Sequence, residues 1–81
     1  MPSAKSVKVY STSSCPYCHM AKRFLDENKI AYTDVDVGRD RAAAAEMVRL
    51  SGQMGVPVTD IDGTIIVGFD REKIKAALGI K

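Results

Sequence analysis

Short apolar runs separated by polar breaks predict a protein in which strands and helices alternate. Residues 7–10 alternate apolar and polar side chains, which predicts a first short strand, and the polar residues 11–14 predict a loop after it. From Pro16 onward the chain has two contrasting faces at helical spacing, which is typical of an amphipathic helix. The apolar face carries Met20, Ala21, Phe24 and Leu25, and the charged face carries Lys22, Arg23, Asp26 and Glu27.

The middle of the chain repeats this order of strand and helix. Residues 31–37 alternate as a strand does, and Gly38 ends the run. A second helix is expected to end at Gly52, because glycine readily adopts the left-handed conformation that follows a last helical turn. The inner face of this helix is expected to carry Ala44, Met47, Val48 and Ser51.

The last part of the chain predicts a β-hairpin and a short helix. Two β-rich runs, 56–61 and 64–67, are separated by Asp62-Gly63, a dipeptide favoured in two-residue turns because both residues need a positive φ. Asp70 is a suitable N-cap for a final helix that ends at Gly79. Its inward face is expected to carry Ile74, Ala77 and Leu78.

The resulting order β-α-β-α-β-β-α predicts the α/β class, with a small mixed four-stranded sheet and helices on both of its faces. We expect residues 1–81 to form a single domain, because a chain of 81 residues with 46% hydrophobic positions supplies one small core. This length excludes a two-domain enzyme. The recurrent apolar residues are expected to be core: Phe24, Leu25, Met47, Val48, Ile65, Val67, Ile74 and Leu78.

Charge and hydropathy restrict the partners that we expect. The net charge is +2 with both signs interspersed, so the chain has no basic stripe for a phosphate backbone and nucleic acid is not an expected partner. No apolar run approaches the roughly 20 residues of a membrane helix, and the alternating first ten residues differ from a signal peptide. We therefore expect a cytoplasmic protein without membrane contact, and a monomer by default.

The candidate chemistry lies in the two cysteines, Cys15 and Cys18. A disulfide between residues so close in sequence closes too short a loop to stabilise a fold, so the pair is expected to be a redox switch. Cys15 lies where a strand gives way to a helix, and unpaired N–H groups at a helix N-terminus stabilise a thiolate. Pro16 suits the first helical position. Cys18, nearly one turn further, is expected to be more shielded and to have a higher pKa, so Cys15 attacks and Cys18 resolves.

Three other interpretations of this pair are open. The cysteines could be small buried apolar residues that happen to lie together. Cys15, Cys18 and His19 also match the spacing of a c-type haem attachment site. A closed zinc site is disfavoured, because these residues supply three ligands at most and no metal is expected. We interpret His19 instead as an exposed residue of the first turn that supports the thiolate.

The motif Cys-Pro-Tyr-Cys after the first strand, Val56-Pro57 before the third and Val67-Gly68-Phe69-Asp70 before the last helix together resemble the glutaredoxins of the thioredoxin superfamily. This resemblance spans essentially the whole chain. It implies a thioredoxin fold and a thiol-disulfide oxidoreductase that acts on disulfide-containing or glutathionylated proteins. Glutathione would be the reducing cosubstrate, and no bound cofactor is needed.

The resemblance also implies a binding site. Pro57 matches the cis-proline of the family, which leaves the N–H and C=O of Val56 free to pair with glutathione; an ordinary trans-proline opening a strand is the alternative. Gly68, Phe69 and Asp70 fall where glutaredoxins hold the γ-glutamyl end of glutathione, although Asp70 could be a plain N-cap. An apolar rim for a protein substrate is expected from Tyr17, Val56 and Phe69.

Several positions depart from the glutaredoxin pattern. Thr12 stands where the family usually has a basic residue, and the stretch before the last helix has substitutions at Val67, Phe69 and Arg71. Gly68-Phe69 resembles NrdH-type redoxins, which are recharged by thioredoxin reductase and serve ribonucleotide reductase. A third, non-enzymatic alternative is that the cysteines bind a metal or an iron–sulfur cluster, as some glutaredoxin relatives do.

Overall fold

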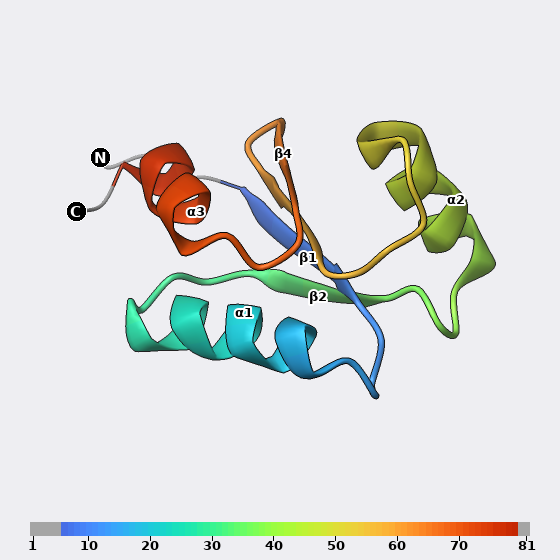
Figure 1. Ribbon diagram of the computed structural model, residues 1–81, viewed down its shortest axis with the longest axis horizontal. Helices are drawn as coiled ribbons and strands as arrows, with labels where there is room; N and C mark the ends of the chain where they lie inside the picture. The colour runs from blue at the N-terminus through green and yellow to red at the C-terminus, as the bar shows by residue number, and fades with distance from the viewer. Residues whose placement is uncertain (1–5, 80–81) are drawn as a thin grey trace.

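The computed structural model describes residues 6–79 and contains the seven expected elements in the expected order (Figure 1). The elements are β1 (Val7–Ser11), α1 (Pro16–Glu27), β2 (Thr33–Asp36), α2 (Arg41–Ser51), β3 (Val58–Ile61), β4 (Thr64–Val67) and α3 (Arg71–Leu78). None of these helices is both long and apolar enough to cross a membrane.

The four strands form one mixed sheet in the order β2-β1-β3-β4. The inner strand β1 runs parallel to β2 and antiparallel to β3, and β3 runs antiparallel to β4. Asp62 and Gly63 join the last two strands, and both have positive φ angles, 52° and 96°, as the predicted two-residue turn requires. The predicted mixed sheet is confirmed.

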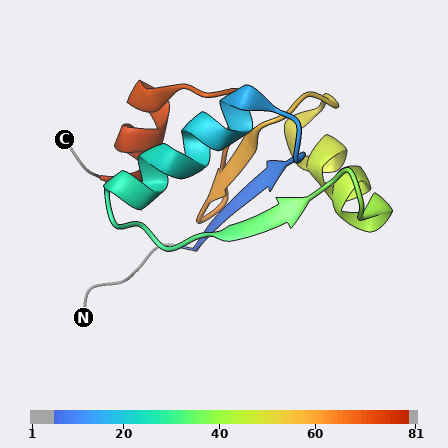
Figure 2. The same cartoon turned by 90° about the horizontal axis from the view of Figure 1, so that it is seen from below.

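Helices cover both faces of this sheet, as predicted (Figure 2). On one face, Phe24 and Leu25 of α1 and Ile74 of α3 pack against alternate residues of the strands. On the other face, Met47 of α2 packs against Tyr10 and Val58. The strands β1, β3 and β4 thus contribute apolar side chains to both clusters, because successive residues of a strand point to opposite faces.

Local sequence signals mark the helix ends. Asp40 caps α2 by accepting a hydrogen bond from the Ala43 N–H at 3.1 Å, and Asp70 caps α3 in the same way through the Lys73 N–H. Both helices end at a glycine in the left-handed conformation, Gly52 and Gly79.

Two strands are shorter than the sequence pattern predicts. The run 31–37 forms a strand only over Thr33–Asp36, which matches the four residues that pair with β1. The run 56–61 forms a strand only from Val58, because Pro57 has no N–H to donate to a ladder.

Two apolar residues that were predicted to face the core are exposed instead. Val67 is 50% exposed, whereas its neighbour Ile66 is 3% exposed, because Ile66 is the residue of β4 that faces α1 and α3. Met20 is also exposed, at 47%, although it belongs to the predicted apolar face of α1. The remaining predicted core residues are buried or packed against the two clusters.

The contrast between Ile66 and Val67, which are adjacent in β4, gives a matched test of the fold. Ile66→Thr should lower the free energy of unfolding by about 2 kcal/mol or more, because it removes buried apolar surface and buries a hydroxyl group. Val67→Thr should change it by less than about 0.5 kcal/mol, because the side chain is half exposed and both residues are β-branched. Urea unfolding of the two variants measures the difference, and equal losses would contradict the assignment of faces.

Candidate redox site

The site forms where the end of β1 meets the start of β3. Antiparallel pairing places Tyr10 opposite Val58, so the loop that follows β1 and the residues that precede β3 lie at the same end of the sheet. Cys15 is reached through the first loop, and Val56 and Pro57 directly precede β3. Two segments about forty residues apart in sequence are therefore brought together by a single strand pairing: the Cys15 thiol lies 3.9 Å from the Val56 carbonyl oxygen and donates to it.

Cys15 is the N-cap residue of α1 and remains partly exposed. Its backbone is extended, with φ −97° and ψ 112°, and its Sγ accepts a hydrogen bond from the Cys18 N–H at 3.2 Å. Pro16 follows in the first turn, which contains no acidic residue. The Cys15 sulfur therefore lies at the N-terminus of α1 and accepts one of the N–H groups that have no partner within the helix.

Cys18 differs sharply from Cys15, as the sequence predicts. Its side chain is completely buried, with 0% exposure. Burial and the hydrogen bond with Cys15 raise the pKa of the Cys18 thiol to about 12, although a backbone hydrogen bond with Thr12 and the charge of Lys22 act in the opposite direction. The pair therefore combines an accessible sulfur with one that holds its proton at neutral pH.

A polar network lies one helical turn below Cys18. Lys22 follows Cys18 by four residues on α1 and forms an ion pair of 3.0 Å with Asp34 of β2. Asp34 also accepts a hydrogen bond of 2.7 Å from the buried hydroxyl group of Ser11. Burial alone would raise the pKa of Asp34, but the hydrogen bonds from Ser11 and Lys22 hold it below its usual range. Sequence analysis missed this network, whose members come from three separate elements.

The Val56–Pro57 peptide bond is cis, as the resemblance implies. The Val56 N–H makes no hydrogen bond within the described part of the chain. Pro57 is fully buried, and its carbonyl accepts a hydrogen bond from the Gly68 N–H at 2.8 Å. This bond holds the segment before α3 against the segment before β3.

The segment before α3 combines a cap with an aromatic cluster. Gly68 has a φ of 80°, Asp70 caps α3, and Phe69 packs edge-on against Phe24 with 6.2 Å between ring centroids. Arg71 places its guanidinium group 5.5 Å from the centroid of the Phe24 ring. The interpretation of Asp70 as an N-cap is correct. Phe69 was expected in an exposed apolar rim, but its side chain is partly buried and packs against the core.

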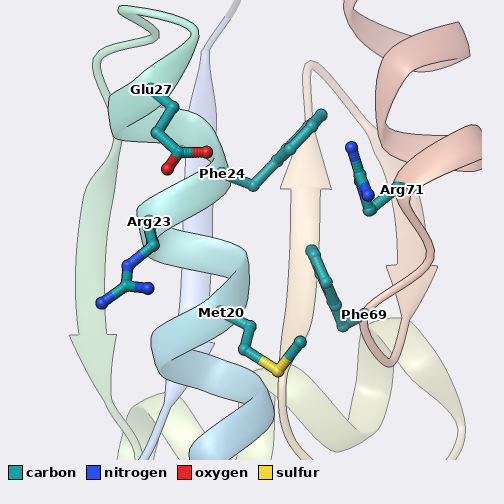
Figure 3. Close-up of a pocket in the computed structure, with 6 residues that line it drawn as sticks. All are labelled: Met20, Arg23, Phe24, Glu27, Phe69 and Arg71. Carbon is teal, nitrogen blue, oxygen red and sulfur yellow. The ribbon is translucent and has the colours of Figure 1, made fainter.

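A shallow groove of about 220 Å³ lies between α1 and this segment (Figure 3). The apolar side chains that line it are Met20, Phe24 and Phe69, which converge in the close-up view. Charged residues from α1 and α3 complete its lining: Arg23, Glu27 and Arg71. Exposure of Met20 is explained by its place on the wall of this groove, which the helical pattern alone does not reveal.

Tyr17 and Met54 are the most exposed large apolar side chains of the described residues, at 61% and 80%. Tyr17 lies between the two cysteines and agrees with the predicted rim. Met54 lies two residues before Val56 and was not predicted, because a single methionine in a loop carries no periodic signal.

Residues 6–79 contain no group of three or more His, Cys, Asp or Glu side chains placed to hold a metal ion. His19 is exposed, and its Nε2 lies 3.0 Å from the Ser13 carbonyl oxygen, which it reaches as a donor. Support of the Cys15 thiolate by His19 stays a prediction.

The protonation of Cys18 can be measured directly in a Cys15→Ser variant. Alkylation of Cys18 by iodoacetamide should be slow at pH 7 and should rise about tenfold per pH unit, because burial, the main cause of the raised pKa, remains. In denaturant the same thiol should react as an ordinary cysteine with a pKa near 9.0. Cys18→Ser, with Cys15 intact, is the control. Equal rates for the two folded variants at pH 7 would contradict the predicted difference between the thiols, and faster alkylation of Cys18 would reverse the assigned roles.

Comparisons with known proteins agree with this arrangement. The glutaredoxin family profile matches residues 7–66. The chain is 47% identical over 68 residues to the glutaredoxin-like 8.6 kDa protein in the rubredoxin operon of Clostridium pasteurianum, covering 84% of this chain and 91% of that protein. It is 34% identical over 65 residues to glutaredoxin 3 of Escherichia coli, covering 80% and 78% of the two chains.

A solved structure extends the comparison to the whole fold. The NrdH-redoxin of Escherichia coli, a glutaredoxin-like protein described as having a thioredoxin-like activity profile, superposes with a TM-score of 0.78 at 25% identity, covering 88% of this chain and 92% of that one. Further structural neighbours include thioredoxin-like proteins and glutaredoxins. The expected thioredoxin fold is confirmed, and the chain belongs to the glutaredoxin family.

Proposed function

We propose that this protein is a thiol-disulfide oxidoreductase that reduces protein disulfides or glutathione mixed disulfides through Cys15 and Cys18. The observation that carries the proposal is the asymmetry of the pair. Cys15 is partly exposed at the N-terminus of α1, and its sulfur accepts a hydrogen bond from the Cys18 N–H. The Cys18 side chain is buried, and its raised pKa keeps the thiol protonated at neutral pH. Such a pair suits one thiol to attack and the other to resolve.

The reaction proceeds in two exchanges that transfer two electrons to the target. The Cys15 thiolate attacks one sulfur of the target disulfide, so a bond forms between Cys15 and the target while the target's own S–S bond breaks. The departing sulfur takes up a proton. Cys18 then loses its proton and attacks Cys15, which releases the reduced target and leaves a Cys15–Cys18 disulfide. Two thiols of a reductant reopen this disulfide, and no bound cofactor takes part.

An extended substrate is expected to pair with Val56. The N–H of Val56 has no partner among the described residues, and its C=O faces the Cys15 thiol at 3.9 Å. A cysteinyl segment that pairs with these groups would hold its sulfur beside Cys15. Tyr17 and Gly68 would form the surrounding surface, with the buried Pro57 and the packed Phe69 behind them and Asp70 at the cap of α3.

Glutathione is the reductant that we propose first. Membership of the glutaredoxin family supports it, and the backbone N–H and C=O of Val56 could pair with a peptide such as glutathione. Recharging by thioredoxin reductase, with ribonucleotide reductase as a target, is the second candidate. Two observations favour it: Thr12 supplies no positive charge, and one oxygen of Asp70 is already engaged by the Lys73 N–H. Either route fits a reducing compartment such as the cytoplasm.

The two candidates differ in which reductant recharges the oxidised protein. NADPH consumption should be rapid with glutathione and glutathione reductase, and slow with thioredoxin reductase alone. Cys15→Ser is the blank for both assays, because it removes the attacking sulfur. Recharging by thioredoxin reductase alone would instead place the protein with the NrdH-type redoxins.

A Cys18→Ser variant separates the two exchanges. It should lose the reduction of protein disulfides, yet still remove glutathione from a mixed disulfide, because that step needs only Cys15 and an external thiol. Wild-type inactivity in both recharging assays would contradict the proposal. Binding of a metal or an iron–sulfur cluster would then be the function to test, by the absorbance of protein purified without air.

A further inference from the structure

The loop between α2 and Pro57 is held by the side chain of Gln53. Its Nε2 donates to the Gly55 carbonyl oxygen at 3.0 Å, and its Oε1 accepts from the Gly55 N–H at 2.8 Å. One amide group therefore engages both backbone polar groups of one residue. The Ser51 hydroxyl lies 2.7 Å from the Met47 carbonyl oxygen and 2.9 Å from the Gln53 carbonyl oxygen, which fastens this loop to the last turn of α2.

Gly55 and Gln53 depend on each other. A Cβ atom at Gly55 would lie 2.7 Å from the Gln53 Oε1, closer than such atoms approach. The nearest obstacle is the end of a flexible side chain, so an alanine at this position would displace the Gln53 amide and leave the backbone in place. Gly55→Ala is therefore a second, independent way to break the two hydrogen bonds of Gln53.

One of these two hydrogen bonds, from Gln53 Nε2 to the Gly55 carbonyl oxygen, acts directly on the peptide unit that carries the Val56 N–H. The Gly55 C=O and the Val56 N–H belong to one planar peptide unit, and the only cis bond among residues 6–79 is the next one. In a trans unit the C=O and N–H point in opposite directions, so an oxygen fixed toward Gln53 directs the Val56 N–H away from Gln53. An accepted hydrogen bond also polarises the unit and makes its N–H a better donor.

We propose that Gln53 is a positioning residue for the substrate: by holding both polar groups of Gly55, it aims the unpaired Val56 N–H at the extended segment whose sulfur reacts with Cys15. The inference rests on the proposed function, in which Val56 pairs with the substrate. It adds a residue that touches neither the substrate nor the reacting sulfur. Gln53 lies three residues before Val56 and acts through the peptide unit between Gly55 and Val56.

A comparison of two substrates tests this role. One substrate is a glutathionylated peptide, which can pair with Val56; the other is 5,5′-dithiobis(2-nitrobenzoate), a disulfide without a peptide backbone. In Gln53→Ala, Gln53→Glu and Gly55→Ala, the KM for the peptide should rise about three- to tenfold with kcat retained, because one aligned hydrogen bond to the substrate is weakened. The rate constant of Cys15 with the small disulfide should stay within about twofold.

Gln53→Glu sharpens the comparison, because it keeps an acceptor for the Gly55 N–H and loses the donor to the Gly55 C=O. The double variant Gln53→Ala with Gly55→Ala should be no worse than either single variant, since both break the same hydrogen bonds. Asn28→Ala is the matched control. It removes a 2.8 Å amide-to-carbonyl bond to Phe24 at the far end of α1 and should leave both substrates unaffected.

Three results would overturn the inference. They are an unchanged KM for the peptide in every variant, an equal loss with both disulfides, or additive losses in the double variant. A wild-type protein that reacts with the small disulfide but leaves the peptide untouched would contradict the proposed function itself, and the role of Gln53 with it. Circular dichroism of each variant ensures that a loss is not caused by unfolding.

Discussion

The antiparallel pairing of β1 with β3 is the constraint on which the site depends. Its register sets Tyr10 opposite Val58, and this places the chain that leaves β1 beside the chain that enters β3. Because side chains alternate along a strand, a slip of one strand by one residue would turn its apolar side chains to the opposite face of the sheet and remove them from their clusters. The distance of 3.9 Å between the Cys15 sulfur and the Val56 oxygen is thus a property of the sheet as much as of the loops.

Backbone groups, more than side chains, surround the reactive sulfur. The Cys18 N–H donates to Cys15 Sγ, the Val56 carbonyl oxygen lies 3.9 Å from the same sulfur, and the Gly68 N–H donates to the carbonyl of Pro57. Backbone groups provide the same donors and acceptors whatever residue occupies the position. The arrangement of these donors and acceptors near Cys15 therefore depends on the course of the backbone.

The parts that sequence predicted were those with a local or periodic signal. Element order followed from alternation and from caps such as Asp40 and Asp70, and the exposure of Cys15 relative to Cys18 followed from their places in one helical turn. Ile66 and Val67 could not be distinguished, because both are β-branched and apolar and only the register shows which one faces α1. The hydrogen bonds of Gln53 depend on the shape of one loop, and no pattern of residue types announces them.

In the mechanism proposed above, complete burial leaves Cys18 with a proton that it does not readily lose, and this would limit the rate at which Cys18 resolves a mixed disulfide at Cys15. In such an adduct the second sulfur is one helical turn away, and its burial favours the protonated SH form over the thiolate. The adduct would therefore persist for a time, and during it thiols from solution could reach the partly exposed Cys15 sulfur. Under the proposed mechanism, the buried Cys18 would thus divide each adduct between closure of the Cys15–Cys18 disulfide and exchange with an outside thiol.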